Sequence, residues 1–139
     1  MELTKIITKI GEAMADTKES AEDYLERILI LQEEKGIKEV HAVDIANSFS
    51  YSKPSVSVAM KKLEDKGYVA LGPKSQLYLT PAGYQIAKDM YERHQVLSGL
   101  FMSLGVNEDI ASKDACKIEH DLSDETWQAI KKFYKENNK

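Results

Sequence analysis

The sequence predicts a mainly α protein with one small β-hairpin. Apolar residues recur at helical spacing along most of the 139 residues, which indicates a series of amphipathic helices. Two short β-like runs flank a Gly-Pro turn at residues 72–75, which indicates a hairpin. The only basic third of the chain surrounds that turn.

Four helices are expected before the hairpin, at residues 1–15, 20–34, 40–47 and 54–65. The last follows a tight turn at 49–54, and Pro54 suits its first position because proline needs no intrahelical partner there. Its apolar residues, which we expect to point inward, are Val56, Met60 and Leu63.

The hairpin is expected to pair residues 68–71 with 76–80 across a four-residue turn. Three helices should follow, at 81–104, 107–120 and from 123 onward. Their predicted N-caps are Thr80, Asn107 and Ser123, whose side chains can accept hydrogen bonds from the first helical turn. This order of elements is that of a winged helix-turn-helix: a helix, a short helix, a turn, a further helix and a hairpin.

The charge distribution agrees with nucleic-acid binding by the predicted winged helix-turn-helix. Net charge is −4, yet residues 41–80 hold 5 lysines against 3 acids, whereas residues 1–40 hold 10 acids against 6 bases. Residues 81–139 are acidic too, with 10 acids and 8 bases. A basic face on the hairpin domain suits phosphate, so we expect double-stranded DNA as a partner. The plain alternative is a small helical domain with an incidental hairpin.

Composition places the chain among ordinary globular proteins, with 42% hydrophobic and 30% charged residues. A single cysteine rules out an internal disulfide and fits a reducing compartment. The sequence shows neither an apolar run of about 20 residues nor a secretory h-region. We therefore expect a cytoplasmic protein without membrane attachment.

The segment with candidate metal-binding side chains is Cys116-Lys-Ile-Glu119-His120. On a helix, Cys116, Glu119 and His120 stand one turn apart and can converge on one point. Thiolate, carboxylate and imidazole all bind first-row transition metals. The segment is therefore either half of a metal site or a solvated helix face that carries a buried thiol.

Several segments resemble the diphtheria-toxin-repressor family of iron- and manganese-dependent DNA-binding regulators. The similarity runs from about residue 20 to 133, and the most specific segment is Asp-Ala-Cys-Lys-Ile-Glu-His-Asp-Leu-Ser at 114–123. The other segments are Ala-Glu-Asp-Tyr-Leu-Glu at 21–26, Pro-Ser-Val-Ser at 54–57, Leu-Glu-Asp-Lys-Gly-Tyr-Val at 63–69, Leu-Thr-Pro-Ala-Gly at 79–83 and Arg-His at 93–94.

The resemblance implies a homodimer in a short form without the SH3-like third domain of longer relatives. It implies an extension helix at 1–19, a winged helix-turn-helix DNA-binding domain at 20–80, and a helical metal-binding and dimerisation domain at 81–139. The metal ligands it implies are Asp23, Cys116, Glu119 and His120, with Glu26 and His94 at a second position.

The sequence does not decide which metal binds. By the resemblance, aspartate at 23 is typical of the manganese branch and cysteine at 116 of the iron branch, so the chain mixes the two. We expect Fe²⁺ or Mn²⁺, and Zn²⁺ or Co²⁺ could bind in vitro because a thiolate softens the site. Ser98 and Ser112 stand where iron-type members carry further ligands, which puts their ancillary site in doubt.

Each proposed ligand has a structural alternative. Cys116 could be a small buried hydrophobe. Glu26, beside Arg27, could be a surface charge. Ser20 and Asp23 could form a capping box, which would compete with metal binding by Asp23. His41 is expected to cap a helix or to lie on the surface.

On the DNA side, the helix expected at 54–65 is the recognition helix. Ser55, Ser57 and Val58 are candidates for contacts with base edges. The candidates for phosphate contacts are Lys53, Lys61, Lys62 and Lys74. That helix offers no Arg, Asn or Gln for bidentate base readout, so specificity should depend on DNA shape and spacing.

These expectations combine into a metal-activated repressor of metal-uptake genes that binds a pseudo-palindromic operator as a dimer. One alternative is a metal-independent winged-helix regulator that responds to an organic ligand. Another is a metallo-hydrolase that uses Glu119 as base, although the sequence offers no second acid–base pair and no Gly-rich substrate loop. We expect no enzymatic activity.

Overall fold

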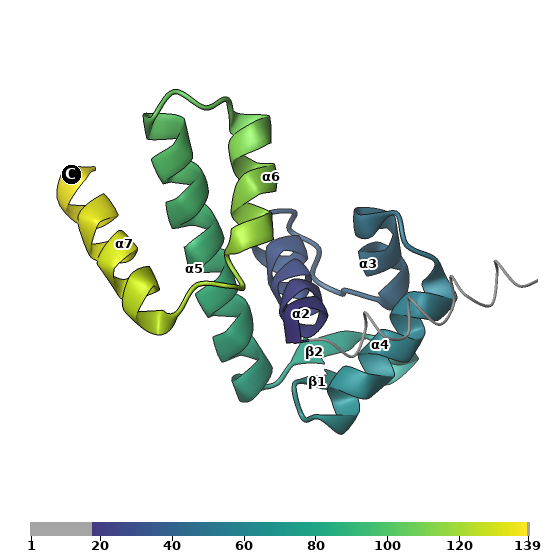
Figure 1. The fold of residues 1–139 in the computed structure, drawn as a ribbon. Helices are drawn as coiled ribbons and strands as arrows, with labels where there is room; N and C mark the ends of the chain where they lie inside the picture. The colour runs from purple at the N-terminus through teal and green to yellow at the C-terminus, as the bar shows by residue number, and fades with distance from the viewer. Residues whose placement is uncertain (1–17, 139) are drawn as a thin grey trace, which may run out of the picture. The chain divides into compact units, whose positions relative to one another are not determined.

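The structure is a computed structural model that describes residues 18–138, so the helix expected at 1–15 lies outside the described residues. The described chain falls into two compact units, one ending at Lys88 and the other beginning at Asp89. Figure 1 labels the elements in chain order. The mainly α fold with one two-stranded hairpin is confirmed.

The first unit contains the elements of a winged helix-turn-helix. They are α2 (Lys18–Glu33), α3 (Ala42–Phe49), α4 (Lys53–Asp65), β1 (Val69–Leu71) and β2 (Leu77–Leu79). Helix α3 packs on both α2 and α4, as the two helices of such a motif do. Val56, Met60 and Leu63 of α4 are buried, as expected.

The α3–α4 turn has clear local causes. Ser50 ends α3 in the left-handed region at φ 60°. The Ser52 side chain accepts a hydrogen bond from Ser55 N–H and caps α4, so Pro54 lies one position later than predicted. His41 caps α3 as expected, and its backbone N–H donates to Asp44 at 2.8 Å.

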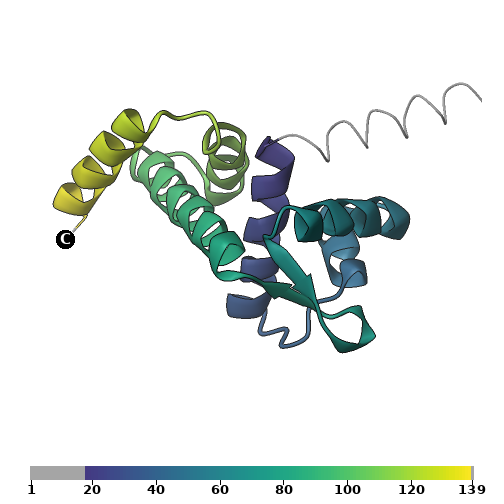
Figure 2. The same ribbon diagram turned by 90° about the horizontal axis from the view of Figure 1, so that it is seen from below.

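The wing is the antiparallel hairpin of β1 and β2, which Figure 2 shows from below. Val69 pairs with Leu79 and Leu71 with Leu77. Leu77 N–H also donates to Val40 O at 2.8 Å, and both side chains are buried, so the segment before α3 extends the sheet. Lys74 lies in the exposed loop between the strands.

An aromatic cluster of Tyr24, Phe49 and Tyr51 joins α2 to the α3–α4 turn. Phe49 and Tyr51 stack at 5.0 Å, and Tyr24 meets Phe49 edge-on at 5.7 Å. The guanidinium of Arg27 lies 4.8 Å from the Phe49 ring centroid, a favourable cation–π distance. The cluster therefore fixes the turn that precedes α4.

The second unit consists of most of α5 (Pro81–Ser103), with α6 (Glu108–Ile118) and α7 (Asp124–Asn137). Helices α6 and α7 lie on opposite sides of α5 in both views (Figures 1 and 2). On the α7 side, Lys131 pairs with Glu92 at 2.6 Å. Asn107 and Ser123 cap α6 and α7, as predicted. None of the described helices has the length and apolarity that a membrane span requires.

Candidate metal centre and DNA-binding surface

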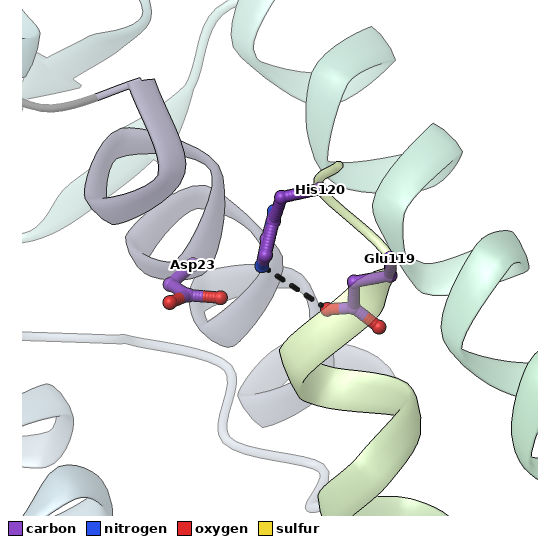
Figure 3. Close-up of side chains that lie close together, drawn as sticks. All are labelled: Asp23, Glu119 and His120. Atoms are coloured by element: carbon purple, nitrogen blue, oxygen red, sulfur yellow. Dashed lines mark ion pairs between the residues drawn. The ribbon is translucent and has the colours of Figure 1, made fainter. Parts of the chain in front are cut away.

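Two imidazoles of the second unit converge on one buried carboxylate, Glu119. His94 Nδ1 of α5 lies 3.0 Å from Glu119 Oε2, and His120 Nε2 lies 3.5 Å from Glu119 Oε1. Figure 3 shows the second of these ion pairs. The Glu119 side chain has no exposure to solvent, and that of His120 only 2%. Both carboxylate oxygens thus face nitrogen donors inside the protein.

The hydrogen bonding of Glu119 is incomplete among the described residues. Oε2 meets His94, whereas buried Oε1 accepts no hydrogen bond from the described part of the chain, since His120 approaches only to ion-pair distance. A buried carboxylate oxygen without a hydrogen bond is costly. A divalent cation would supply the missing partner, and a carboxylate with two imidazoles suits Mn²⁺, Fe²⁺ or Zn²⁺. These residues fit a metal.

Glu119 and His120 lie just past the end of α6, where we had expected the helix to continue to about His120. Glu119 is the C-cap of α6 and His120 lies in the turn that follows. Arg93 of α5 fixes this turn, because its guanidinium donates to Glu119 O at 3.1 Å and to Leu122 O at 3.4 Å. It also lies over the Trp127 ring, at 5.5 Å.

Arg93 is a residue whose role the sequence reasoning missed. The Arg-His pair at 93–94 was visible in the sequence, yet nothing in its spacing showed that the arginine binds carbonyls 26 and 29 residues away. Its donors satisfy carbonyls beyond the helix end, which otherwise have no intrahelical partner. Arg93 therefore holds the backbone that carries the candidate ligands Glu119 and His120.

Cys116 lies on the exposed side of α6, one turn before Glu119. The alternative of a small buried hydrophobe is therefore wrong. That Cys116 joins Glu119 and His120 in one site stays a prediction.

The remaining ligand candidates, Asp23 and Glu26, lie on α2 of the first unit. Their spacing of three places both on one face of the helix. Glu26 is 5% exposed, so the surface-charge alternative for it is wrong. Ser20 lies inside α2 rather than at its start, so it does not cap this helix. Between the two acids, the pKa of the Tyr24 phenol is raised by burial, by Tyr51 and by the neighbouring Asp23.

The predicted DNA-contact residues of α4 lie opposite its buried face. Val58 is 45% exposed, and Ser55 and Ser57 are exposed beside it. The lysines on this helix are Lys53 and Lys61, both exposed, and Lys62, which is half-buried. The Ser55 hydroxyl accepts a hydrogen bond from Ser52 Oγ at 2.8 Å, so it retains its own hydrogen for an outside acceptor. The exposed wing residue Lys74 adds a second basic element.

A helix-turn-helix with an exposed basic recognition helix and a wing defines the class of winged-helix DNA-binding regulators. Residues 16–77 match the family model "Iron dependent repressor, N-terminal DNA binding domain". Residues 80–139 match "Iron dependent repressor, metal binding and dimerisation domain". The chain belongs to this family, which is the diphtheria-toxin-repressor family that the motifs predicted.

Curated relatives agree with this assignment. The chain is 36% identical over 119 residues to the transcriptional regulator MntR of Salmonella typhimurium, covering 86% of this chain and 74% of that protein. It is 40% identical over 111 residues to MntR of Geobacillus thermodenitrificans, covering 80% and 75%. Neither family model describes an enzyme, and none of these relatives supports a regulator that responds to an organic ligand.

Solved structures share the fold. The manganese regulator SloR superposes with a TM-score of 0.72 at 29% identity, covering 83% of this chain and 53% of that one. A manganese-dependent transcriptional repressor solved with manganese gives the same score and identity, covering 83% and 52%. The chain thus spans about half the length of these solved relatives.

Proposed function

We propose that this chain is a homodimeric, metal-activated repressor that binds a pseudo-palindromic operator and controls metal-uptake genes in the cytoplasm. One observation carries the proposal: His94 and His120 converge on the fully buried carboxylate of Glu119, in the segment that matches a metal-binding domain. A bound cation would compensate the charge of this buried acid and give the two imidazoles a common partner.

The ligand set we propose joins this centre to α2. Glu119 and His120 would hold the first metal together with Cys116 and with Asp23 of the DNA-binding domain. Glu26 and His94 would hold a second metal beside Glu119. Support comes from the burial of Glu26 and Glu119, the common face of the two α2 acids, and the family match.

Fe²⁺ or Mn²⁺ is the metal we propose, with Zn²⁺ and Co²⁺ as substitutes in vitro. Carboxylate oxygens and imidazoles suit Mn²⁺ and Fe²⁺ alike, whereas the exposed Cys116 thiol favours softer ions. The MntR relatives and the manganese-containing neighbour support manganese. The thiol supports iron.

Metal would act by linking two parts of the chain that are far apart in sequence. A cation bound by Asp23 of α2 and by Glu119 and His120 binds more tightly to arrangements that hold these ligands together. It therefore shifts the population toward them. The same α2 packs on α3 and on the wing strand β2, so a restrained α2 restrains the DNA-reading elements.

For DNA, we propose that Ser55, Ser57 and Val58 face base edges and that Lys53, Lys61, Lys62 and Lys74 contact phosphate. Their exposure on one side of α4 and on the wing supports this assignment. The second unit would form the dimer, as the matched dimerisation domain indicates. Two copies related by a two-fold axis would then read two half-sites.

The Glu119→Gln variant tests the metal centre. The amide keeps the shape but removes the charge, so we expect the rise in Tm on adding Mn²⁺ or Zn²⁺ to disappear. At metal concentrations 100-fold above Kd, that rise reflects about 2.7 kcal/mol in the parent protein. Glu136→Gln, at an exposed position in the last turn of α7, is the matched control and should keep the full rise. An equal rise in both variants would refute the site.

A further inference from the structure

His94 has a second partner that the metal ligands do not include, the hydroxyl of Ser112. His94 Nε2 lies 3.2 Å from Ser112 Oγ, while Nδ1 lies 3.0 Å from Glu119 Oε2. Ser112 is on α6, and Glu119 is seven residues further, two turns along the same side of the helix. One ring nitrogen of His94 therefore contacts Glu119, and the other contacts Ser112, two turns earlier on α6.

These contacts fix the orientation of the ring. Turning the imidazole by 180° would place carbon atoms against both the carboxylate and the hydroxyl, and would lose both hydrogen bonds. Nδ1 is therefore the nitrogen on the Glu119 side. Because Glu119 is a proposed metal ligand, Nδ1 is the atom of His94 that would share a cation with it.

The Glu119 carboxylate and the Ser112 hydroxyl differ in whether they can donate as well as accept a hydrogen bond. Beside an ionised carboxylate, which only accepts hydrogen bonds, Nδ1 carries the hydrogen when no metal is bound. A metal on Nδ1 needs the lone pair there, and the ring hydrogen must then be on Nε2. A hydroxyl both donates and accepts, so Ser112 can donate to bare Nε2 and can equally accept from Nε2–H.

We propose that Ser112 is a positioning residue that holds His94 in metal-binding orientation and satisfies Nε2 in both tautomers. The inference rests on the proposed metal site. With a metal bound at Nδ1, the ring hydrogen would lie on Nε2, and the hydrogen displaced from Nδ1 would pass to water. The hydroxyl hydrogen of Ser112 rotates, and no heavy atom has to move.

Ser112 would therefore contribute to metal affinity without being a metal ligand. Outer partners of metal-binding histidines typically contribute 10–100-fold to affinity, roughly, because they fix the tautomer and orientation of the ring. At position 112 an alanine would leave Nε2 without its protein partner. A threonine would keep the hydroxyl.

The chain offers a matched control in Ser98. Its hydroxyl also bonds to His94, at 2.6 Å, but to the backbone carbonyl and not to the ring. Ser98→Ala removes a serine hydroxyl from the same histidine while leaving both ring nitrogens with their partners. Alanine is a better helix former than serine, so neither variant should lose its helix.

Two-bond ¹H–¹⁵N spectra of histidine-labelled full-length protein, titrated with Zn²⁺, test the inference directly. We expect His94 to carry its hydrogen on Nδ1 without metal and on Nε2 with Zn²⁺. The Zn²⁺ concentration that shifts the His94 signals should rise about 10-fold in Ser112→Ala. It should stay at the parent value in Ser98→Ala and in Ser112→Thr.

Two results would overturn the role of Ser112 while leaving the metal site intact: parent-like affinity in Ser112→Ala, or Zn²⁺-loaded protein with the hydrogen on Nδ1. Spectra of the parent in which His94 does not respond to Zn²⁺ at all would instead overturn the metal site itself, and this inference with it. The two failures are therefore distinguishable in one set of spectra.

Discussion

Replacing Gly83 with alanine should destabilise the protein, because the glycine lies against the backbone of the wing. It lies in the first turn of α5, directly against the backbone of Tyr68 at the start of the wing. A Cβ at position 83 would overlap the Tyr68 carbonyl oxygen and lie 2.9 Å from the carbonyl carbon, where ordinary contacts are 3.4 Å or more. Alanine there must push α5 and the wing apart.

Moving the Tyr68 carbonyl away from position 83 would disturb the hydrogen bonds that hold this backbone. This carbonyl accepts a hydrogen bond from Thr80 N–H at 3.1 Å, and Thr80 Oγ1 donates to the adjacent Gly67 carbonyl at 2.7 Å. Overpacking of this kind costs about 1–3 kcal/mol, and the upper part of that range applies because the obstacle is hydrogen-bonded backbone. Alanine regains up to about 1 kcal/mol of helix propensity, which leaves a net loss of about 2 kcal/mol. For a chain of this length that lowers Tm by about 6 °C.

Gly99→Ala is the control on the same helix. A Cβ there would meet the hydroxyl end of the Tyr134 side chain, which can rotate out of the way, so the propensity gain should dominate. We expect thermal unfolding followed by circular dichroism to show a lower Tm for Gly83→Ala and an unchanged or higher Tm for Gly99→Ala. Equal Tm values for the two variants would refute the reasoning.

Three further predictions concern other parts of the chain. Phe49→Leu removes two ring contacts and a cation–π contact, so urea unfolding should show a loss of about 1–3 kcal/mol, whereas Phe133→Leu, at an exposed site, should change little. Lys61→Ala should reduce the slope of log K for DNA against log salt by about 1, the value for one phosphate contact, and an unchanged slope would exclude that contact. Cys116→Ser should abolish the thiolate-to-metal absorption band of the Co²⁺-loaded protein, and a spectrum identical to the parent's would show that Cys116 is not a ligand.

Much of the fold was predictable because its signals are local. The capping residues Asn107 and Ser123 mark helix starts that the structure reproduces, since their side chains satisfy donors within the first turn. The Gly-Pro turn at 72–75 marked the wing. The largest deviations at helix ends were two residues, at the start of α2, at both ends of α3 and at the end of α6.

The site was only partly predictable, because its geometry depends on contacts between distant segments. The spacing of Cys116, Glu119 and His120 indicated a metal half-site, yet the helix ends before two of them, and the thiol is exposed while Glu119 is buried. The pairing of His94 with Glu119 joins residues 25 apart, and no local pattern reports such a contact. For the same reason, only the structure shows the contacts of Arg93 with the Glu119 carbonyl and of Ser112 with His94.

The most direct test of the account measures DNA binding with and without metal. Duplexes with a randomised core, enriched on the Mn²⁺-loaded protein, would be titrated under anaerobic conditions with Mn²⁺, Fe²⁺ or a chelator, and binding followed by fluorescence anisotropy. The account predicts tight binding with at least one of the two ions and a loss of at least about 10-fold with chelator, a coupling of about 1.4 kcal/mol. Equal affinity in metal and in chelator would contradict it.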